Sequence, residues 1–166
     1  LMTPSNVMSE SIYQSINKLH SQHAICQADK KVSIGLVKIA NIDPLVHIAK
    51  QLFRKSAPSE TRIYYCVYHG QYPLLQRSSI EQMLDKALTR HCQKEWQQNS
   101  GILDIINNSQ EQHHVFVVLA TSVAEVGRDH DYDWAVVEPS SLRSIIQLAG
   151  RVQRHRKQVP EQANIH

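Results

Sequence analysis

The sequence predicts an α/β fold in which a mainly parallel sheet carries helices on both faces. Short apolar runs typical of buried strands recur along the chain, and they are Val32–Ile39, Thr61–Tyr68, Val115–Ala120 and Trp134–Val137. Segments with apolar residues at helical spacing separate these runs. Because successive parallel strands need a crossover between them, usually a helix, this alternation favours the predicted architecture.

Composition bounds the class of protein. The chain has 166 residues, of which 42% are hydrophobic and 20% charged, as is typical of one globular domain. Its net charge of +3 is compatible with nucleic-acid binding but too small to argue for it. The longest apolar run, Val115–Ala120, is too short to span a bilayer, and the first residues do not resemble a secretory signal. Because position 1 is leucine, we expect the chain to be a segment of a longer protein.

Cysteine and histidine spacing indicates the compartment and argues against a metal site. Cys26, Cys66 and Cys92 are widely separated, which favours a reduced, cytoplasmic compartment. The chain contains ten histidines, but none falls in the spacing of a zinc motif. We therefore expect no structural metal.

Residues 1–31 are polar and are interpreted as a partly helical connector. Within them a helix is expected over about residues 9–23, because three apolar residues recur at helical spacing, namely Ile12, Ile16 and Leu19. A polar turn follows, and the first strand begins at Val32.

The helix after the first strand is expected to begin at Asp43. Asp43 is a favourable N-cap residue and Pro44 is favourable at the first helical position, so together they predict a helix start. This helix is expected to end near Ala57 and Pro58.

The third helix follows the strand Thr61–Tyr68. Ser78 and Glu81 have the spacing of a capping box and predict helix capping, with the helix continuing to about Trp96. A shorter helical piece is expected at Ile102–Ile106. Trp96 and Trp134 are both expected to serve packing rather than base stacking.

The segment Glu138–Arg156 is predicted to form the last helix, beginning near Pro139 and the two serines behind it. Its apolar residues at i, i+3, i+4 and i+7 predict a buried face, formed by Leu142, Ile145, Ile146 and Ala149. A second stripe at i, i+4 and i+7 consists of Gln147, Arg151 and Arg154, with Gly150 allowing close approach. Because the planar guanidinium matches phosphate oxygens, this stripe predicts a phosphate-binding surface.

Polar loops follow several of the predicted strands. They lie at Asn41, at His69-Gly70 and at Thr121–Asp131. In parallel α/β sheets, ligands bind at the carboxyl ends of the strands. We therefore expect these loops and the start of the last helix to converge on one site.

The chain lacks a phosphate-binding loop of its own. No GxxxxGK[ST] motif occurs, and the five glycines are widely scattered. Arginines can nevertheless neutralise charge on a transferring phosphoryl group. The simplest explanation is that a second domain holds the nucleotide and that this one supplies the arginines.

Two stretches carry a resemblance to a known family. The sequence TSVAEVGRD, from Thr121 to Asp129, is followed by a short strand and then by QLAGRVQR, from Gln147 to Arg154. This order resembles motifs V and VI of superfamily 2 helicases. The longer stretch GRDHDYDWAVVEPSSLRSIIQLAGRVQRHR is similar to the CRISPR-associated helicase–nuclease family of type I systems, most closely to the subtype fused to an adaptation subunit. The resemblance covers about residues 32–156.

The resemblance implies a RecA-like three-layer fold over residues 32–156, as the second lobe of a two-lobed motor, followed by a polar tail at 157–166. Arg151 and Arg154 would be arginine fingers that reach ATP and Mg²⁺ bound mainly by the first lobe, and Gln147 would orient the water or the γ-phosphate. Two further residues would face the nucleotide, Gly127 and Asp129. The phosphates of a single DNA strand would contact Thr121, Ser122, His69 and Asn41.

Parts of the whole family protein are absent from this chain, namely the Walker A loop, the acidic Mg²⁺-binding motif and the nuclease domain. The isolated lobe is therefore expected to be inactive, and nuclease-site divalent metals would belong to another domain. The implied partners are single-stranded DNA, the first RecA-like lobe and nuclease domain of the same parent chain, the crRNA-guided surveillance complex and phage-encoded inhibitor proteins. No membrane is implied.

Simpler interpretations stand beside these roles. Asp131 and Asp133 are interpreted as an acidic loop that keeps its turn soluble, and Ser78 and Glu81 as helix capping only. Asn41 and His69 are as well explained by local structure as by DNA contact. For the whole chain, the alternatives are a lobe of an RNA helicase of superfamily 2 and a non-catalytic α/β module that binds a nucleotide or another ligand.

Overall fold

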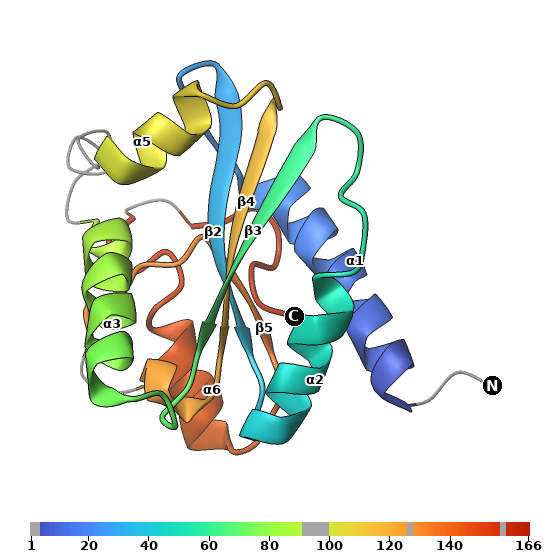
Figure 1. Cartoon of the computed structure of the whole chain (residues 1–166), viewed down its shortest axis with the longest axis vertical. Coiled ribbons are helices and arrows are strands. Elements are labelled where there is room, and N and C mark those ends of the chain that lie inside the picture. Colours follow the sequence, from blue (N-terminus) through green and yellow to red (C-terminus); the bar gives the residue numbers. More distant parts are fainter. Residues whose placement is uncertain (1–3, 91–99, 126–127, 157–158) are drawn as a thin grey trace.

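A computed structural model of the chain describes residues 4–90, 100–125, 128–156 and 159–166. Within these residues a five-stranded sheet forms the middle of three layers (Figure 1). Its strands are β1 (Ile25–Gln27), β2 (Lys30–Lys38), β3 (Thr61–Tyr68), β4 (His113–Ala120) and β5 (Trp134–Val137). The order is β1-β2-β4-β3, and β5 also pairs with β2.

The four longer strands are parallel, as the sequence predicts. Lys38 at the end of β2 aligns with Ala120 at the end of β4 and with Val137 at the end of β5. Tyr68 at the end of β3 aligns with Ala120. All four strands therefore finish along one side of the sheet, which we call the carboxyl edge. The short β1 is antiparallel to β2, so the expected polar turn is a β-hairpin.

Helices cover both faces of the sheet, which confirms the predicted fold class. The helices α1 (Pro4–His23) and α2 (Ile42–Leu52) pack on one face, where their apolar residues share a core with Val115, Val117 and Trp134. The helices α3 (Leu74–Leu88), α5 (Ser100–Asn107) and α6 (Leu142–Ala149) lie on the other face (Figure 1). A short 3₁₀ helix, η1 (Ser122–Glu125), follows β4.

The middle of β2 is buried on both faces, which explains its nearly continuous apolar sequence. Gly35 stands where the Trp134 ring crosses the strand, and a Cβ atom added there would lie 2.3 Å from ring carbons. Trp134 is fully buried, and its indole N–H donates to Ser33 Oγ at 3.0 Å. Its expected packing role is thus confirmed.

Two predicted helix starts are wrong. The helix α2 begins at Ile42 with extended Asn41 as its N-cap, so Asp43 lies in the first turn. The helix α3 begins at Leu74 after Pro73, because the amide of Arg77 already donates to the carbonyl of Pro73 at 2.9 Å. Ser78 and Glu81 therefore lie inside α3 and form no capping box.

Other predicted boundaries differ more modestly. The first helix starts at Pro4, earlier than expected, and α2 ends at Leu52, before the proline at 58. The helix α3 ends at Leu88 with extended Thr89 as its C-cap, so its expected continuation to about Trp96 is wrong. Trp96 and Cys92 themselves lie outside the described residues.

Both ends of the chain pack against the sheet. The helix α1 buries Ile16 and Leu19 completely, and it lies against α2 and β5. At the other end, the amide of Ala135 donates to the carbonyl of Asn164, and the amide of His166 to the carbonyl of Ala135. The end of the expected polar tail thus adds backbone pairing to the edge of β5.

Candidate functional site

The predicted stripe of one glutamine and two arginines does not exist as a helical stripe. The helix α6 ends at Ala149, and Gly150 caps it by donating to the carbonyl of Ile146. The chain then turns back toward Tyr132, whose amide donates to the carbonyl of Arg151 at 2.8 Å. This tertiary pairing ends the helix, so Arg151 and Arg154 lie in the turn that follows it.

The predicted buried face of α6 is also wrong. Leu142 is 74% exposed and Ile146 is 63% exposed, whereas Leu148 and Ser144 are buried. Ser144 faces inward because its hydroxyl bonds to Glu125 on η1 and to the buried Lys38 on β2. Apolar spacing alone could not reveal this polar anchor.

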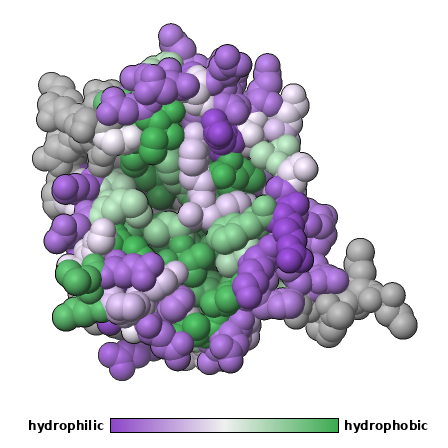
Figure 2. All heavy atoms as spheres, in the orientation of Figure 1, coloured by the Kyte–Doolittle hydropathy of each residue, from purple (hydrophilic) through white to green (hydrophobic). Residues whose placement is uncertain are grey.

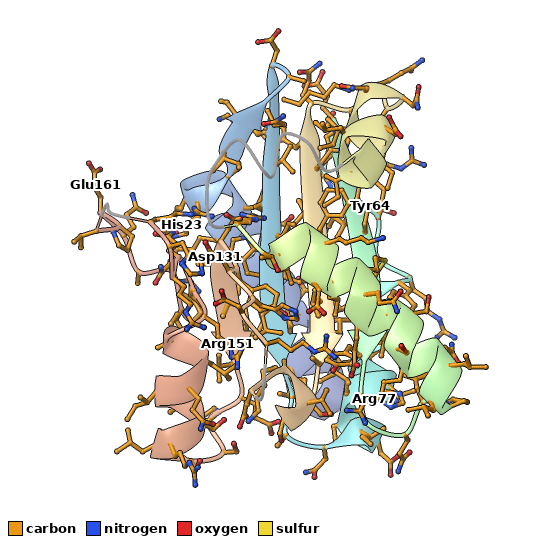
Figure 3. The ribbon with its side chains drawn as sticks, turned by 90° about the vertical axis from the view of Figure 1, so that its left-hand side faces the viewer. His23, Tyr64, Arg77, Asp131, Arg151 and Glu161 are labelled. Carbon is orange, nitrogen blue, oxygen red and sulfur yellow. The ribbon has the colours of Figure 1, made fainter. Side chains whose placement is uncertain are left out.

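Arg151 is directed into the protein. It is only 8% exposed, and one guanidinium nitrogen donates to the carbonyl of Glu125 at 3.0 Å. The other donates to the carbonyl of Arg128. Figure 3 shows Arg151 just above α6 and below Asp131. Arg151 thus binds the backbone on both sides of residues 126 and 127, while Gly127 itself lies outside the described residues.

Arg154 has a different environment and keeps its side chain 46% exposed. Its guanidinium lies 2.9 Å from a carboxylate oxygen of Asp129, the same oxygen that His155 Nε2 approaches at 3.2 Å. Its backbone amide donates to Asp131 Oδ1 at 3.0 Å. Two aspartates therefore hold Arg154, one through the side chain and one through the backbone.

The interpretation of Asp131 and Asp133 as a solubilising acidic loop is wrong. Asp131 is 1% exposed and Asp133 is fully buried. Burial raises the pKa of the Asp131 carboxyl. Asp133 Oδ1 accepts from Arg90 at 2.9 Å and also from Arg156, and its other oxygen accepts from the amide of Ile34 at 2.5 Å. These aspartates position the turn that carries the arginines.

The loop before β5 is held from the other side by α3. Arg128 forms ion pairs with Glu81 and Asp85. His130 Nε2 lies 2.9 Å from Asp85, and burial lowers the pKa of this imidazole. Glu81 additionally accepts from Tyr68 Oη at 2.8 Å, so its expected role as a simple cap is wrong.

Lys38 is a site residue that sequence reasoning missed. It ends β2 and is completely buried at the carboxyl edge, next to Glu125, Ser140 and Ser144. The sequence did contain a signal for this role, namely a lysine within an otherwise apolar strand. Because a buried lysine requires compensating partners, such a lysine predicts a buried polar site.

The residues expected to contact DNA come together at the carboxyl edge. Asn41 follows β2 and is exposed, and its side chain makes no cap hydrogen bond. His69 follows β3 and stacks on Tyr72 with ring centroids 4.2 Å apart. Thr121 follows β4 and is buried, whereas the next residue, Ser122, is exposed. Three strands thus deliver short polar side chains to one edge.

A separate apolar groove lies away from this edge. It has a volume of about 660 Å³ between α3, α5 and the middle of β3 and β4, with Met83, Ile102 and Phe116 among its lining residues. Figure 2 shows apolar side chains gathered over this part of the molecule with hydrophilic ones around them. The polar loops do not line this groove.

The described residues contain no group of three or more acidic, histidine or cysteine side chains placed to hold a metal ion. Among the same residues, no helix is both long and apolar enough to cross a membrane. Two kinds of polar chemistry are present: the exposed guanidinium of Arg154 with a half-buried Gln147 near the end of α6, and, at the carboxyl edge, polar groups suited to phosphate oxygens.

Comparison with solved structures shows the fold. The chain superposes on T. fusca Cas3 with AMPPNP at a TM-score of 0.61 and 17% identity, covering 95% of this chain and 16% of that one. A second T. fusca Cas3 structure matches at a TM-score of 0.58 and 18% identity. The chain thus shares the RecA-like three-layer fold of the matching region in these structures.

Sequence comparison then shows the family. The family model of the CRISPR-associated nuclease/helicase Cas3, C-terminal, matches residues 31–157, so the chain belongs to this family. The Cas3 of subtype I-F/YPEST from Pectobacterium atrosepticum is 53% identical over 96% of the chain. Its counterpart from Pseudomonas aeruginosa is 46% identical over 89%. The chain spans only 15% and 14% of the lengths of these two curated relatives.

Proposed function

We propose that this chain is the second motor lobe of an ATP-driven, single-strand DNA translocase that acts in CRISPR interference. The observation that carries the proposal is an exposed arginine, Arg154, held by Asp129 in the turn that follows α6, in a sequence without a phosphate-binding loop. Such a residue fits a nucleotide that another domain presents. Family membership supports the proposal, because the matching relatives are named nuclease/helicases.

In this proposal the two arginines differ in role. Arg154 reaches the phosphates of ATP, which the first lobe binds with Mg²⁺, and Asp129 holds the guanidinium in place beforehand. Arg151 maintains the loop around Gly127 through the carbonyls of Glu125 and Arg128. Gln147 lies half-buried on α6 and orients the attacking water or the γ-phosphate.

The DNA-contacting role falls to the polar residues at the strand ends. Ser122, Thr121, Asn41 and His69 offer hydroxyl, amide and imidazole groups to a phosphate backbone along one edge. Because such groups contact phosphates rather than bases, the lobe would move along a strand without reading its sequence. Closure of two lobes around ATP, followed by hydrolysis and opening, would drive each step.

The proposal extends to further partners, and family membership supports those of CRISPR interference. We propose that the parent chain also provides the first lobe and a nuclease domain with its own divalent metals. It would be recruited by a crRNA-guided surveillance complex and targeted by phage-encoded inhibitors.

The decisive experiment measures ATP hydrolysis by the full-length protein carrying Arg154→Ala. We expect a loss of about 10³-fold or more, because removal of an arginine finger has effects of this order. Arg54→Ala is the matched control, since Arg54 is exposed after the end of α2, a helix on the face of the sheet opposite to α6. Near wild-type hydrolysis by Arg154→Ala, with the control unchanged, would overturn the proposal.

Two assays separate the alternatives. Stimulation of ATP hydrolysis by single-stranded RNA rather than DNA would favour an RNA helicase lobe. Tight binding of a nucleotide to this chain alone would favour a self-sufficient ligand-binding module. The proposed function predicts weak binding and no hydrolysis by the isolated chain.

A further inference from the structure

The side chain of Lys38 is part of a buried polar network at the carboxyl edge. Its Nζ lies 2.6 Å from Ser140 Oγ, 3.1 Å from Ser144 Oγ and 3.3 Å from Glu125 Oε1. Ser144 Oγ in turn donates to Glu125 Oε1 at 2.5 Å. The two serine hydroxyls accept hydrogen bonds from the ammonium group, and Glu125 is its ion-pair partner. We call these four residues the Lys38 network.

The Lys38 network joins three separate elements. Lys38 ends β2, Glu125 ends η1, and Ser144 lies in the first turn of α6. Ser144 is further fixed because its amide donates to Ser141 Oγ, the N-cap of α6. The network thus connects the turn that begins at Thr121 to the helix that carries Gln147.

Among the described residues, Glu125 contacts the arginine site through its backbone only. Its backbone carbonyl accepts from Arg151, while its carboxylate forms an ion pair with Lys38 and accepts from the hydroxyl of Ser144. One residue therefore connects the expected DNA-binding turn, the expected nucleotide-facing loop and α6. Lys38 itself is fully buried, so it cannot contact DNA or a nucleotide in this conformation.

Burial makes this connection stiff. An ammonium group without a counter-charge in a protein interior is strongly unfavourable, so Lys38 holds the carboxylate of Glu125 in place. The side chain of Glu125 is only 12% exposed, and water therefore competes little for the pair. A displacement of η1 when DNA binds would have to shift α6 or break the network.

We propose that the Lys38 network is a positioning device that couples DNA contact at Thr121 and Ser122 to the arginine site that follows α6. This inference rests on the proposed function. In this inference Lys38, Glu125 and Ser144 transmit a change from the DNA-binding turn to the arginine site. None of the three contacts a ligand.

The test compares basal and DNA-stimulated ATP hydrolysis in the full-length protein. Glu125→Gln keeps the side-chain volume and an acceptor oxygen but removes the charge, and Ser144→Ala removes only a hydroxyl. We expect basal hydrolysis to stay within about twofold, while the ratio of stimulated to basal rate falls about five- to tenfold, as expected for loss of a typical coupling between sites. Glu60→Gln is the matched control, because Glu60 is exposed at the opposite end of β3.

The outcomes separate coupling from simple structural support. The inference is overturned if variants with the wild-type melting temperature keep the wild-type ratio of stimulated to basal hydrolysis. It is also overturned if the stimulated and basal rates fall by the same factor. If both variants fail to fold, the network serves the fold itself and the coupling role is rejected. The variant Arg154→Ala keeps the two proposals apart. If Arg154→Ala hydrolyses ATP at the wild-type rate, the proposed function is rejected. If Arg154→Ala loses hydrolysis but Glu125→Gln keeps the wild-type ratio of stimulated to basal rate, only the coupling is rejected.

Discussion

Replacing Asp133 with asparagine tests the buried charge cluster that holds the arginine-bearing turn. Asp133 is fully buried and accepts hydrogen bonds from Arg90, Arg156 and the amide of Ile34. An asparagine side chain there would keep the volume but remove the charge, and its amide hydrogens would face donors. Arg90, itself only 7% exposed, would then lose the negative charge of Asp133 beside it. Breaking a buried ion pair by neutralising one partner costs about 3–5 kcal/mol.

The free energy of unfolding, obtained from urea denaturation, measures this loss. For a chain of this size, a loss of about 3 kcal/mol corresponds to a fall in melting temperature of about 6–12 °C. Asp104→Asn is the matched control, because Asp104 is exposed on α5 and we expect a change below about 0.5 kcal/mol there. A loss below about 1 kcal/mol for Asp133→Asn would refute the argument that this cluster stabilises the turn.

The same carboxylate predicts a pH dependence. Burial alone would raise the pKa of Asp133, but Arg90 and Arg156 outweigh it and lower that pKa below its ordinary value of 3.8. The stabilisation is therefore present above about pH 4 and is lost as pH falls through the lower pKa of the folded state. Asp133→Asn should abolish this part of the acid sensitivity.

Two further predictions concern the core of the sheet. Gly35→Ala should lower the free energy of unfolding by about 1–3 kcal/mol, because the added Cβ atom would overlap the Trp134 ring. The control Gly150→Ala should lower it by less than about 1 kcal/mol, since the atom nearest to its added Cβ lies 3.6 Å away. Equal urea midpoints for the two variants would contradict this prediction. Burial, reinforced by His113, lowers the pKa of His20 from 6.5 to about 4, so between these values the unfolded chain binds a proton that the folded chain does not. Stability should therefore rise by about 3 kcal/mol from about pH 4 to about pH 6.5, and an identical slope in His20→Gln would rule out His20 as its source.

The layered fold was predictable because strand periodicity and turn residues are local signals. The strands at Thr61 and Trp134 begin where their β-branched and aromatic residues begin. Parallel pairing follows from the alternation of strands and helices, so the convergence of Asn41, His69 and Thr121 on one edge was predictable as well.

Predictions for the last helix failed where tertiary contacts compete with helical spacing. Leu142 and Ile146 appeared to form a buried face, yet the anchor of α6 is Ser144, which bonds to groups on other elements. Likewise, Arg151 appeared to continue the helix, but pairing with Tyr132 turns the chain away after Gly150.

The sequence by itself determined the α/β class, the parallel sheet, the family resemblance and the set of residues expected at the carboxyl edge. Only the tertiary structure decided what each charged side chain does. Arg151 is directed inward and Arg154 outward, Asp133 is buried between two arginines, and Lys38 is enclosed with Glu125. The physical reason is that the state of a charge depends on its burial and on partners far along the chain, as Lys38 and Ser144 illustrate, and neighbouring sequence does not reveal them.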